Sequence, residues 1–324
     1  MKKLLIIGTN TCLIVLATSW AFKLWTPSHE KIHPSLPPHS FYPFTLTESD
    51  ARIPCLQAEI EGIPFLAKLD IGYDGVLSLP KHLLEQLAHK RDAETVLFKG
   101  IKGGEYESPV FTLPQLNIGD LTLMDFPAEE TNLEFERDTN LGIHTDPPDA
   151  IARIGWRAFF GTVVLIDFNK GIGACCDSLE TLKEQGYPLE QFVSTNLLPG
   201  EQYVGFEADI GNRKIKCILD TGCTLNLINT LSTDEESEFG SVDLDNPLPS
   251  SVLSIGGRDL GPCVFYKTPL PFGVEAIIGV DFLETQIICI DLVNNTLHLC
   301  PVPEEDSLDQ VNSGISSPLY SENE

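Results

Sequence analysis

Basic residues are scarce in this sequence. Its 324 residues include 21 Lys and Arg against 47 Asp and Glu, which gives a formal net charge of -26 at pH 7. A surface of that sign repels phosphate backbones and anionic lipid headgroups, so nucleic acid is not expected as a partner. Electrostatic attraction would favour basic or neutral ligands.

Cysteine and histidine are present but follow no metal-binding pattern. The nine cysteines are too few for a disulfide scaffold in a chain of this length, and they lack the paired Cys-x-x-Cys motifs that are typical of zinc sites. The seven histidines are scattered, and none recurs beside a cysteine as the base of a nucleophile would. We therefore predict no metal, no cofactor and no cysteine nucleophile.

A long apolar run occurs at the N-terminus. Residues 1–25 carry Lys2 and Lys3 ahead of an apolar segment, which predicts either a signal peptide or a membrane anchor that starts in the cytoplasm. Residues 26–45 are rich in proline and read as a tether. Residues 302–324 are acidic, lack Lys and Arg, and read as a disordered tail. The protein is expected to be exported, and to be membrane-anchored, periplasmic or extracellular.

The middle of the chain contains an internal repeat. Ala58–Gly72 aligns without a gap with Ala208–Gly222, and both segments open with Ala-acid-Ile and close with Leu-Asp-x-Gly. Further along, Ile154-Gly155 aligns with Ile278-Gly279, and each is followed by an apolar run. Such duplication predicts two units of the same architecture within one chain.

The hydrophobic pattern favours strands over helices. Short apolar or alternating runs rich in Ile, Val and Phe are separated by Gly, Pro and Asn, and the clearest helical segment is Pro80–Ala88. We predict an all-β fold with two pseudo-symmetric lobes and a cleft between them. The lobes are assigned to residues 46–176 and 201–301, and residues 177–200 are predicted to be the linker.

Asp70 and Asp220 occupy equivalent places in the repeat, each at the end of an apolar strand. Gly72 and Gly222 allow the backbone to fold back and present N–H groups to these carboxylates. If the repeats pack about a two-fold axis, the two aspartates face each other and share one proton. Such a pair can activate water, because one carboxyl accepts a proton while the other donates one.

These residues resemble a known family, the pepsin- and retropepsin-type aspartic proteases, and specifically their bacterial, retropepsin-like forms with two lobes in one chain. Leu219–Thr224 is similar to the family's apolar-Asp-Thr-Gly loop. Arg153-Ile154-Gly155 and Ile277–Gly279 are similar to its later apolar-apolar-Gly element. The resemblance covers about Gln57–Cys300 and implies an endopeptidase with Asp70 and Asp220 as the catalytic pair. It also implies that Thr221 supports the second aspartate.

A substrate-covering flap is implied by the same resemblance. Lys99–Gly104 is similar to the glycine-rich flap hairpin of retropepsin-like proteins, and Leu116–Leu121 is similar to the strand pair that follows it. The residues expected to cover and bind an extended polypeptide substrate are Gly100, Ile101, Gly103 and Gly104. In the second repeat an acidic segment, residues 234–245, stands where a second flap would be, so one flap over one cleft is expected.

Two positions depart from the family pattern. Ile71 stands where the family has Thr or Ser, and Tyr73 replaces a small residue. Loss of a hydroxyl at position 71 would leave Thr221 without its expected partner. The sequence therefore leaves two functions open: an active aspartic endopeptidase, or a catalytically inactive module that binds extended peptides. Since one chain carries both aspartates, a monomer is expected.

Other repeated residues are predicted to be structural. Asp167 and Asp291 end apolar runs just before Asn-containing turns, which is typical of turn-forming acids. Cys176 and Cys300 hold equivalent places and are expected to be small apolar strand residues.

Overall fold

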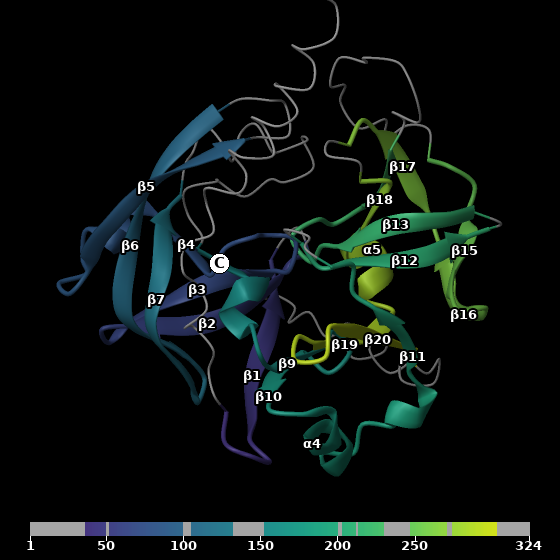
Figure 1. Ribbon diagram of the computed structural model, residues 1–324, viewed down its shortest axis with the longest axis horizontal. Helices are drawn as coiled ribbons and strands as arrows, with labels where there is room; N and C mark the ends of the chain where they lie inside the picture. The colour runs from purple at the N-terminus through teal and green to yellow at the C-terminus, as the bar shows by residue number, and fades with distance from the viewer. Residues whose placement is uncertain are drawn as a thin grey trace, which may run out of the picture. The chain divides into compact units, whose positions relative to one another are not determined.

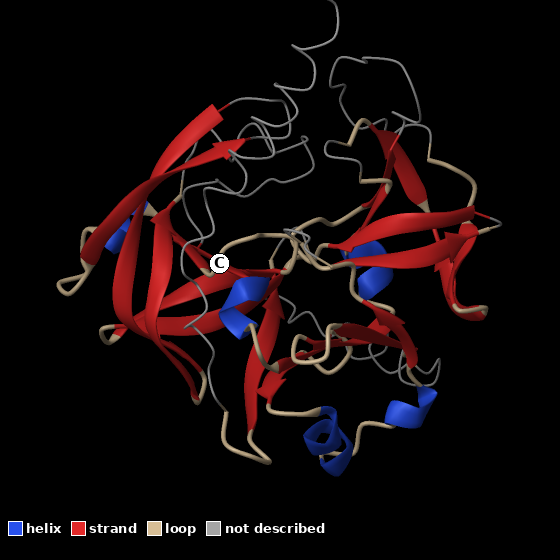
Figure 2. Cartoon of the chain, viewed as in Figure 1, coloured by secondary structure: helices blue, strands red, loops and turns tan. Residues whose placement is uncertain are grey.

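The computed structural model describes residues 36–49, 52–99, 105–131, 152–199, 203–211, 213–229, 247–270 and 274–302. All of them belong to one compact unit, His33–Glu324. Strands dominate these residues and the helices among them are short, as Figure 2 shows. The prediction of an all-β protein is confirmed.

The elements can be followed in Figure 1 from the N-terminal to the C-terminal strands. The strands of the first part are β1 (Phe41–Glu48), β2 (Pro54–Ile60), β3 (Ile63–Asp70), β4 (Leu77–Leu79), β5 (Arg91–Lys99), β6 (Glu105–Ile118), β7 (Leu121–Glu130), β8 (Ala152–Gly155), β9 (Val163–Asp167) and β10 (Ile172–Cys176). The later strands are β11 (Val193–Asn196), β12 (Gly205–Ile210), β13 (Arg213–Leu219), β14 (Asn226–Asn229), β15 (Ser251–Ile255), β16 (Arg258–Cys263), β17 (Phe265–Thr268), β18 (Ala276–Ile278), β19 (Gln286–Asp291) and β20 (Thr296–Pro301). The helices are α2 (Lys81–Leu84), α4 (Leu179–Glu184) and α5 (Val280–Leu283), with 3-10 turns η2 (Trp156–Phe159) and η3 (Leu189–Gln191).

The strands form two sheets. The larger sheet runs in the order β11-β20-β19-β9-β10-β1-β2-β3-β8-β4-β7-β6-β5, and an additional pairing of β2 with β6 closes part of it into a barrel-like loop of strands. The smaller sheet runs in the order β16-β15-β12-β13-β18-β14-β17.

The alternation of side chains along β3 shows why this sequence forms a strand of the barrel-like part. Phe65, Ala67 and Leu69 are buried, whereas Leu66 is 37% exposed and Lys68 is partly exposed. Successive side chains of a strand point to opposite faces, so the apolar ones enter the core. The strand thereby carries Asp70, its last residue, to the edge of the core.

The two repeats share one pattern of strand pairing. β3 pairs in parallel with β8, which pairs antiparallel with β4, and β4 pairs in parallel with β7. In the second repeat β13 pairs in parallel with β18, which pairs antiparallel with β14, and β14 pairs in parallel with β17. Equivalent sequence segments therefore form equivalent local structure around each aspartate.

Strands β9 and β19 join the two repeats through a reciprocal register. Asp167 is the partner of Ile287, and Asp291 is the partner of Val163. In the repeat, Val163 aligns with Ile287 and Asp167 aligns with Asp291. Thus the counterparts of two paired residues are themselves paired, which is the pattern that a two-fold axis produces. This pairing is local and concerns the strands that follow the Ile-Gly elements.

Two boundaries differ from the sequence prediction. Strand β1 begins at Phe41, within residues 26–45 that were assigned to the tether, because Phe41–Thr45 pair with β10 and so extend the sheet. Residues 177–200, predicted to be a linker, contain α4, η3 and β11, and β11 pairs with β20. Residues Phe41–Thr45 and strand β11 pair with β10 and β20, which lie about a hundred residues or more further along the chain, so local sequence does not reveal these pairings.

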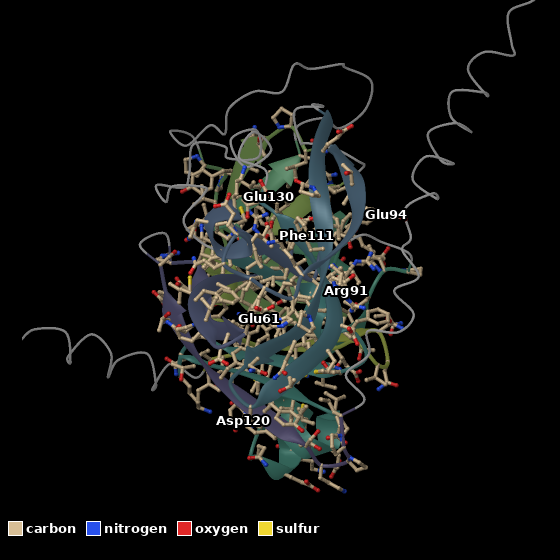
Figure 3. The ribbon with its side chains drawn as sticks, turned by 90° about the vertical axis from the view of Figure 1, so that its left-hand side faces the viewer. Glu61, Arg91, Glu94, Phe111, Asp120 and Glu130 are labelled. Atoms are coloured by element: carbon tan, nitrogen blue, oxygen red, sulfur yellow. The ribbon has the colours of Figure 1, made fainter. Side chains whose placement is uncertain are left out.

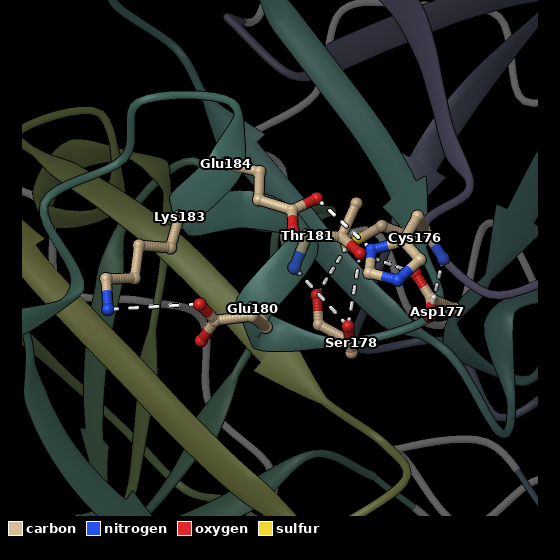
Figure 4. Close-up of polar contacts among 8 residues, drawn as sticks. Cys176, Asp177, Ser178, Glu180, Thr181, Lys183 and Glu184 are labelled. Atoms are coloured by element: carbon tan, nitrogen blue, oxygen red, sulfur yellow. Dashed lines mark hydrogen bonds and ion pairs between the residues drawn. The ribbon is translucent and has the colours of Figure 1, made fainter.

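The helix α4 has a well-defined N-terminus, which Figure 4 shows in close-up. Ser178 accepts a hydrogen bond from the backbone N–H of Thr181 at 3.3 Å, and the Thr181 hydroxyl donates to Asp177 at 2.7 Å. The backbone N–H of His39 donates to the other oxygen of Asp177 at 3.1 Å. Since side-chain caps satisfy N–H groups that a helix leaves unpaired, Ser178 defines where α4 begins, and Asp177 ties it to the start of β1.

Carboxylates are spread over the side of the molecule that Figure 3 shows, which is the left-hand side of Figure 1. The labelled ones are Glu61, Glu94, Asp120 and Glu130, which come from different turns and strands. Glu61 accepts hydrogen bonds from the backbone N–H groups of Ala88 and His89 at 2.8 and 2.9 Å, so it holds a turn.

Among the residues that the structure describes, no helix is long and apolar enough to cross a bilayer. The predicted signal peptide or anchor at residues 1–25 lies outside the described residues, and so does the predicted tail at residues 302–324 apart from its first residue.

Candidate active site

The two aspartates end equivalent strands. Asp70 is the last residue of β3, where its register partner is Gly155 on β8. Asp220 directly follows β13, and its backbone N–H donates to the carbonyl of Ile278 at 3.0 Å. Each aspartate is therefore fixed by the Ile-Gly element of its own repeat.

Each carboxyl group lies against the glycine of the other repeat. A Cβ atom on Gly72 would lie 2.4 Å from Cγ of Asp220, and a Cβ atom on Gly222 would lie 2.5 Å from Cγ of Asp70. Real Cβ atoms do not approach other atoms so closely, so both positions require glycine. The pKa of Asp220 is raised by burial and in part by the charge of Asp70, so the two carboxyl groups interact. The structure thus brings together Asp70, Gly72, Asp220 and Gly222 from segments 150 residues apart.

Thr221 links the two loops beneath the carboxyl groups. Its hydroxyl donates to the carbonyl of Leu69 at 2.6 Å and accepts a hydrogen bond from the backbone N–H of Ile71 at 2.9 Å. Both Thr221 and Ile71 are fully buried. The expectation that Ile71 deprives Thr221 of a partner is therefore wrong, because the backbone around Ile71 supplies both a donor and an acceptor.

The environment of Asp220 favours its protonated form. Burial, followed by the nearby charge of Asp70, raises the pKa of Asp220 well above the usual range of an aspartate. The backbone N–H of Gly222 donates to Asp220 at 2.8 Å and, like the guanidinium of Arg153, acts in the opposite direction. Two carboxyls this close hold a proton between them more readily than they hold two negative charges.

Arg153 lies beside the first aspartate. Its Nε atom is 3.1 Å from Oδ2 of Asp70, and its guanidinium lies over the ring of Tyr73, 5.3 Å from the ring centroid. The Tyr73 hydroxyl in turn donates to Glu129 on β7. In the sequence, Arg153 stands in an element predicted as apolar-apolar-Gly, and that pattern gives no role to a charged side chain. The alignment of Arg153 with the apolar Ile277 of the other repeat is the feature of the sequence that could have indicated a separate role for Arg153.

The Ile-Gly elements pass close behind the aspartate loops. A Cβ atom on Gly155 would lie 2.3 Å from the carbonyl oxygen of Gly75, and one on Gly279 would lie 2.3 Å from that of Leu225. The backbone N–H of Gly279 donates to the side chain of Asn226 at 2.9 Å. These glycines allow a strand to approach each loop and fix its conformation.

The predicted flap residues Gly100, Ile101, Gly103 and Gly104 lie outside the described residues. The strands before and after them, β5 and β6, form an antiparallel pair whose last matched residues are Lys99 and Glu105. The strand pair predicted at Leu116–Leu121 is present as β6 and β7, with Gly119 in the turn at a φ of 57°.

The residues predicted to be structural take those roles. Asp167 and Asp291 are buried and accept hydrogen bonds from the backbone of the turns that follow, from Lys170 at 3.1 Å and Asn294 at 2.8 Å. Cys176 is fully buried, as is nearly all of Cys300, both within strands. These predictions are confirmed.

Substituting Gly222 by Ala tests how tightly the loops are packed. The new methyl group would overlap the carboxyl of Asp70, which must move or push the loops apart, at a cost of about 1 to 3 kcal/mol. Urea denaturation should show a lower free energy of unfolding. Unchanged stability would contradict the contact between Gly222 and Asp70.

Within the described ranges, no group of three or more His, Cys, Asp or Glu side chains could hold a metal ion. A polar hollow at the surface is lined by Gln57, Glu59, Gln115, Asn117 and Asp120 and includes none of the predicted site residues.

No protein-family model matches the chain, and a search of curated proteins finds no match either.

Proposed function

We propose that this chain is an aspartic endopeptidase in which Asp70 and Asp220 activate a water molecule for attack on a peptide bond. The observation that carries the proposal is the reciprocal contact of each carboxyl group with the glycine of the opposite loop. This contact places two carboxyls side by side in an environment that favours one shared proton. Acid and base are then available together at one site.

The proposal extends to the architecture. We infer two pseudo-symmetric, retropepsin-like lobes with a cleft at the aspartates, and residues 100–104 as a flap that covers an extended polypeptide. The repeated strand pairing around β3 and β13 and the reciprocal register of β9 and β19 support this arrangement. Backbone hydrogen bonds between flap and substrate would depend little on side-chain identity.

We also propose that the protein acts outside the cytoplasm as a monomer. Residues 1–25 would export the protein or anchor it in a membrane, so its substrates would be polypeptides outside the cytoplasm. Because one chain supplies Asp70 and Asp220, a monomer would hold a complete catalytic pair.

The pH dependence follows from the shared proton. Activity should fall at low pH, where both carboxyls are protonated, and at high pH, where both are ionised. Because the pKa of Asp220 is raised, activity should be lost on the alkaline side only above the pH at which an ordinary aspartate titrates. The optimum is expected below neutrality.

The proposal is tested with the full chain and a chemically denatured basic protein as substrate. Wild-type protein should produce new peptides at mildly acidic pH, and Asp220→Asn should produce them at least about 100-fold more slowly. Mass spectrometry of the products identifies internal cleavage. Absence of cleavage by the wild type between pH 3 and 8 would contradict the endopeptidase proposal.

A second candidate is a catalytically inactive module that binds extended peptides. The observation that favours it is the ion pair between Arg153 and Asp70, which engages one carboxylate oxygen beside the place where water would bind. In the same experiment, equal inertness of the wild type and Asp220→Asn, with retained binding of the denatured protein, would support this candidate.

A further inference from the structure

The two aspartates have different surroundings although their loops are equivalent. In the first repeat, Lys68 on β3 is the register partner of Arg153 on β8. In the second repeat the aligned pair is Ile218 on β13 and Ile277 on β18. Two basic residues on one side of the pair thus correspond to two isoleucines on the other.

An apolar cluster includes residues that precede and follow Asp220 in the chain. Ile218 belongs to a buried cluster with Leu227, Leu270 and Val274, and side chains from the Asp220 loop and β18 pack against it. These partly buried side chains include Cys223, Leu225 and Ile277. An apolar environment disfavours the charged form of a carboxyl group.

The surroundings of Asp70 are cationic. The Nε atom of Arg153 lies 3.1 Å from Oδ2 of Asp70, and the Asp70 and Arg153 side chains are 13% and 20% exposed, so water screens the pair only partly. The Tyr73 ring lies beneath the guanidinium, and Glu129 holds the Tyr73 hydroxyl. Arg153 therefore contacts both Asp70 and the Tyr73 ring.

We propose that Arg153 is a positioning residue that keeps the negative charge of the pair on Asp70 and leaves the shared proton on Asp220. The inference rests on the proposed function and deepens it, because it assigns a separate role to each aspartate. A guanidinium stays charged throughout the working range of pH and favours the ionised form of the carboxyl that it contacts.

Other titratable groups near the pair do not reverse this assignment. Lys68 lies two residues before Asp70 on the same strand and adds positive charge to that side. Glu129 is engaged by the Tyr73 hydroxyl. On the other side, burial followed by the charge of Asp220 raises the pKa of the Cys223 thiol well above its usual range, so that thiol stays neutral.

The assignment fixes the direction of proton transfer. When the water oxygen bonds to the peptide carbon, Asp70 accepts the water proton and Asp220 gives its proton to the carbonyl oxygen. When the carbon–nitrogen bond breaks, Asp70 returns a proton to the leaving nitrogen and Asp220 recovers one from a hydroxyl. Each aspartate then regains its starting state, and no further reactant is needed.

The kinetic test compares full-chain variants by the pH profile of kcat/KM. Arg153→Ile copies the residue at position 277, and loss of the cation should move the acid limb upward by about 1 to 3 pH units. Arg153→Lys keeps the charge and should restore most of the wild-type profile. Arg157→Gln is the matched control, because Arg157 pairs with Asp74 and should leave the profile unchanged. An unmoved acid limb in active Arg153→Ile would overturn the proposal.

A titration that needs no cleavage separates this proposal from the proposed function. Carbon-13 NMR of the wild-type chain labelled at its aspartate carboxyls follows both groups, and Asp70→Asn and Asp220→Asn assign the signals. We expect Asp70 to ionise at the lower pH and Asp220 at the higher. The reverse order would overturn the role of Arg153 even if Arg153→Ile does not fold. If the expected order is found and the wild type does not cleave, the charge assignment holds and the endopeptidase proposal fails.

Discussion

Replacing either Asp70 or Asp220 by Asn is expected to lower kcat/KM for peptide cleavage by about 100- to 10,000-fold. Asparagine keeps the shape of the side chain but cannot exchange a proton with water or with a carbonyl oxygen. Because the two carboxyls lie against each other's loop glycines, neither has room to be replaced by a bulkier group. The loss should therefore appear in the chemical step, with little change in binding of the denatured substrate.

The two substitutions should be strongly non-additive. Once one member of the pair is lost, the other has no partner with which to share a proton, so the double variant should be about as slow as either single variant. Asp74→Asn is the matched control, because Asp74 lies in the same loop but pairs with Arg157. Additive losses, or an equal loss in Asp74→Asn, would show that Asp70 and Asp220 do not act as a pair.

The sequence predicts the elements that depend on local pattern and on repetition. The repeat predicts an apolar strand that ends at Asp70, and its alignment with the segment that ends at Asp220 predicts an equivalent loop. Glycines at positions 72 and 222 are predicted to support the carboxyls, and the structure places each against the opposite aspartate. Repetition is informative here because two copies of one motif are far less expected by chance than one.

What the sequence could not predict depends on contacts between distant segments. The partners of the Thr221 hydroxyl are backbone groups near Ile71, and backbone groups carry no signature in the sequence. The charge of Arg153 acts on Asp70 only because β8 pairs with β3 in a particular register. The first half of β1, Phe41–Thr45, could not be predicted because it pairs with β10, more than a hundred residues further along the chain.

Thr221→Val should destabilise the fold strongly. Valine has the shape of threonine but no hydroxyl, so the N–H of Ile71 and the carbonyl of Leu69 would each lose their partner in a site that water does not reach. An unsatisfied buried backbone group costs about 1 to 3 kcal/mol, so two such groups predict a loss of about 2 to 6 kcal/mol in the free energy of unfolding. Urea denaturation followed by tryptophan fluorescence measures this loss.

Thr221→Ser is the matched control, since it keeps the hydroxyl and removes one methyl group, which is worth about 1 kcal/mol when buried. If the hydroxyl holds the two loops together, Val must be the more destabilising substitution by more than 1 kcal/mol, and it must also slow cleavage more than Ser does. The second effect is expected because the carbonyl of Leu69 and the N–H of Ile71 flank Asp70 in the chain. Equal stability of the two variants would mean that other groups, and not the Thr221 hydroxyl, fix the relative position of the aspartate loops.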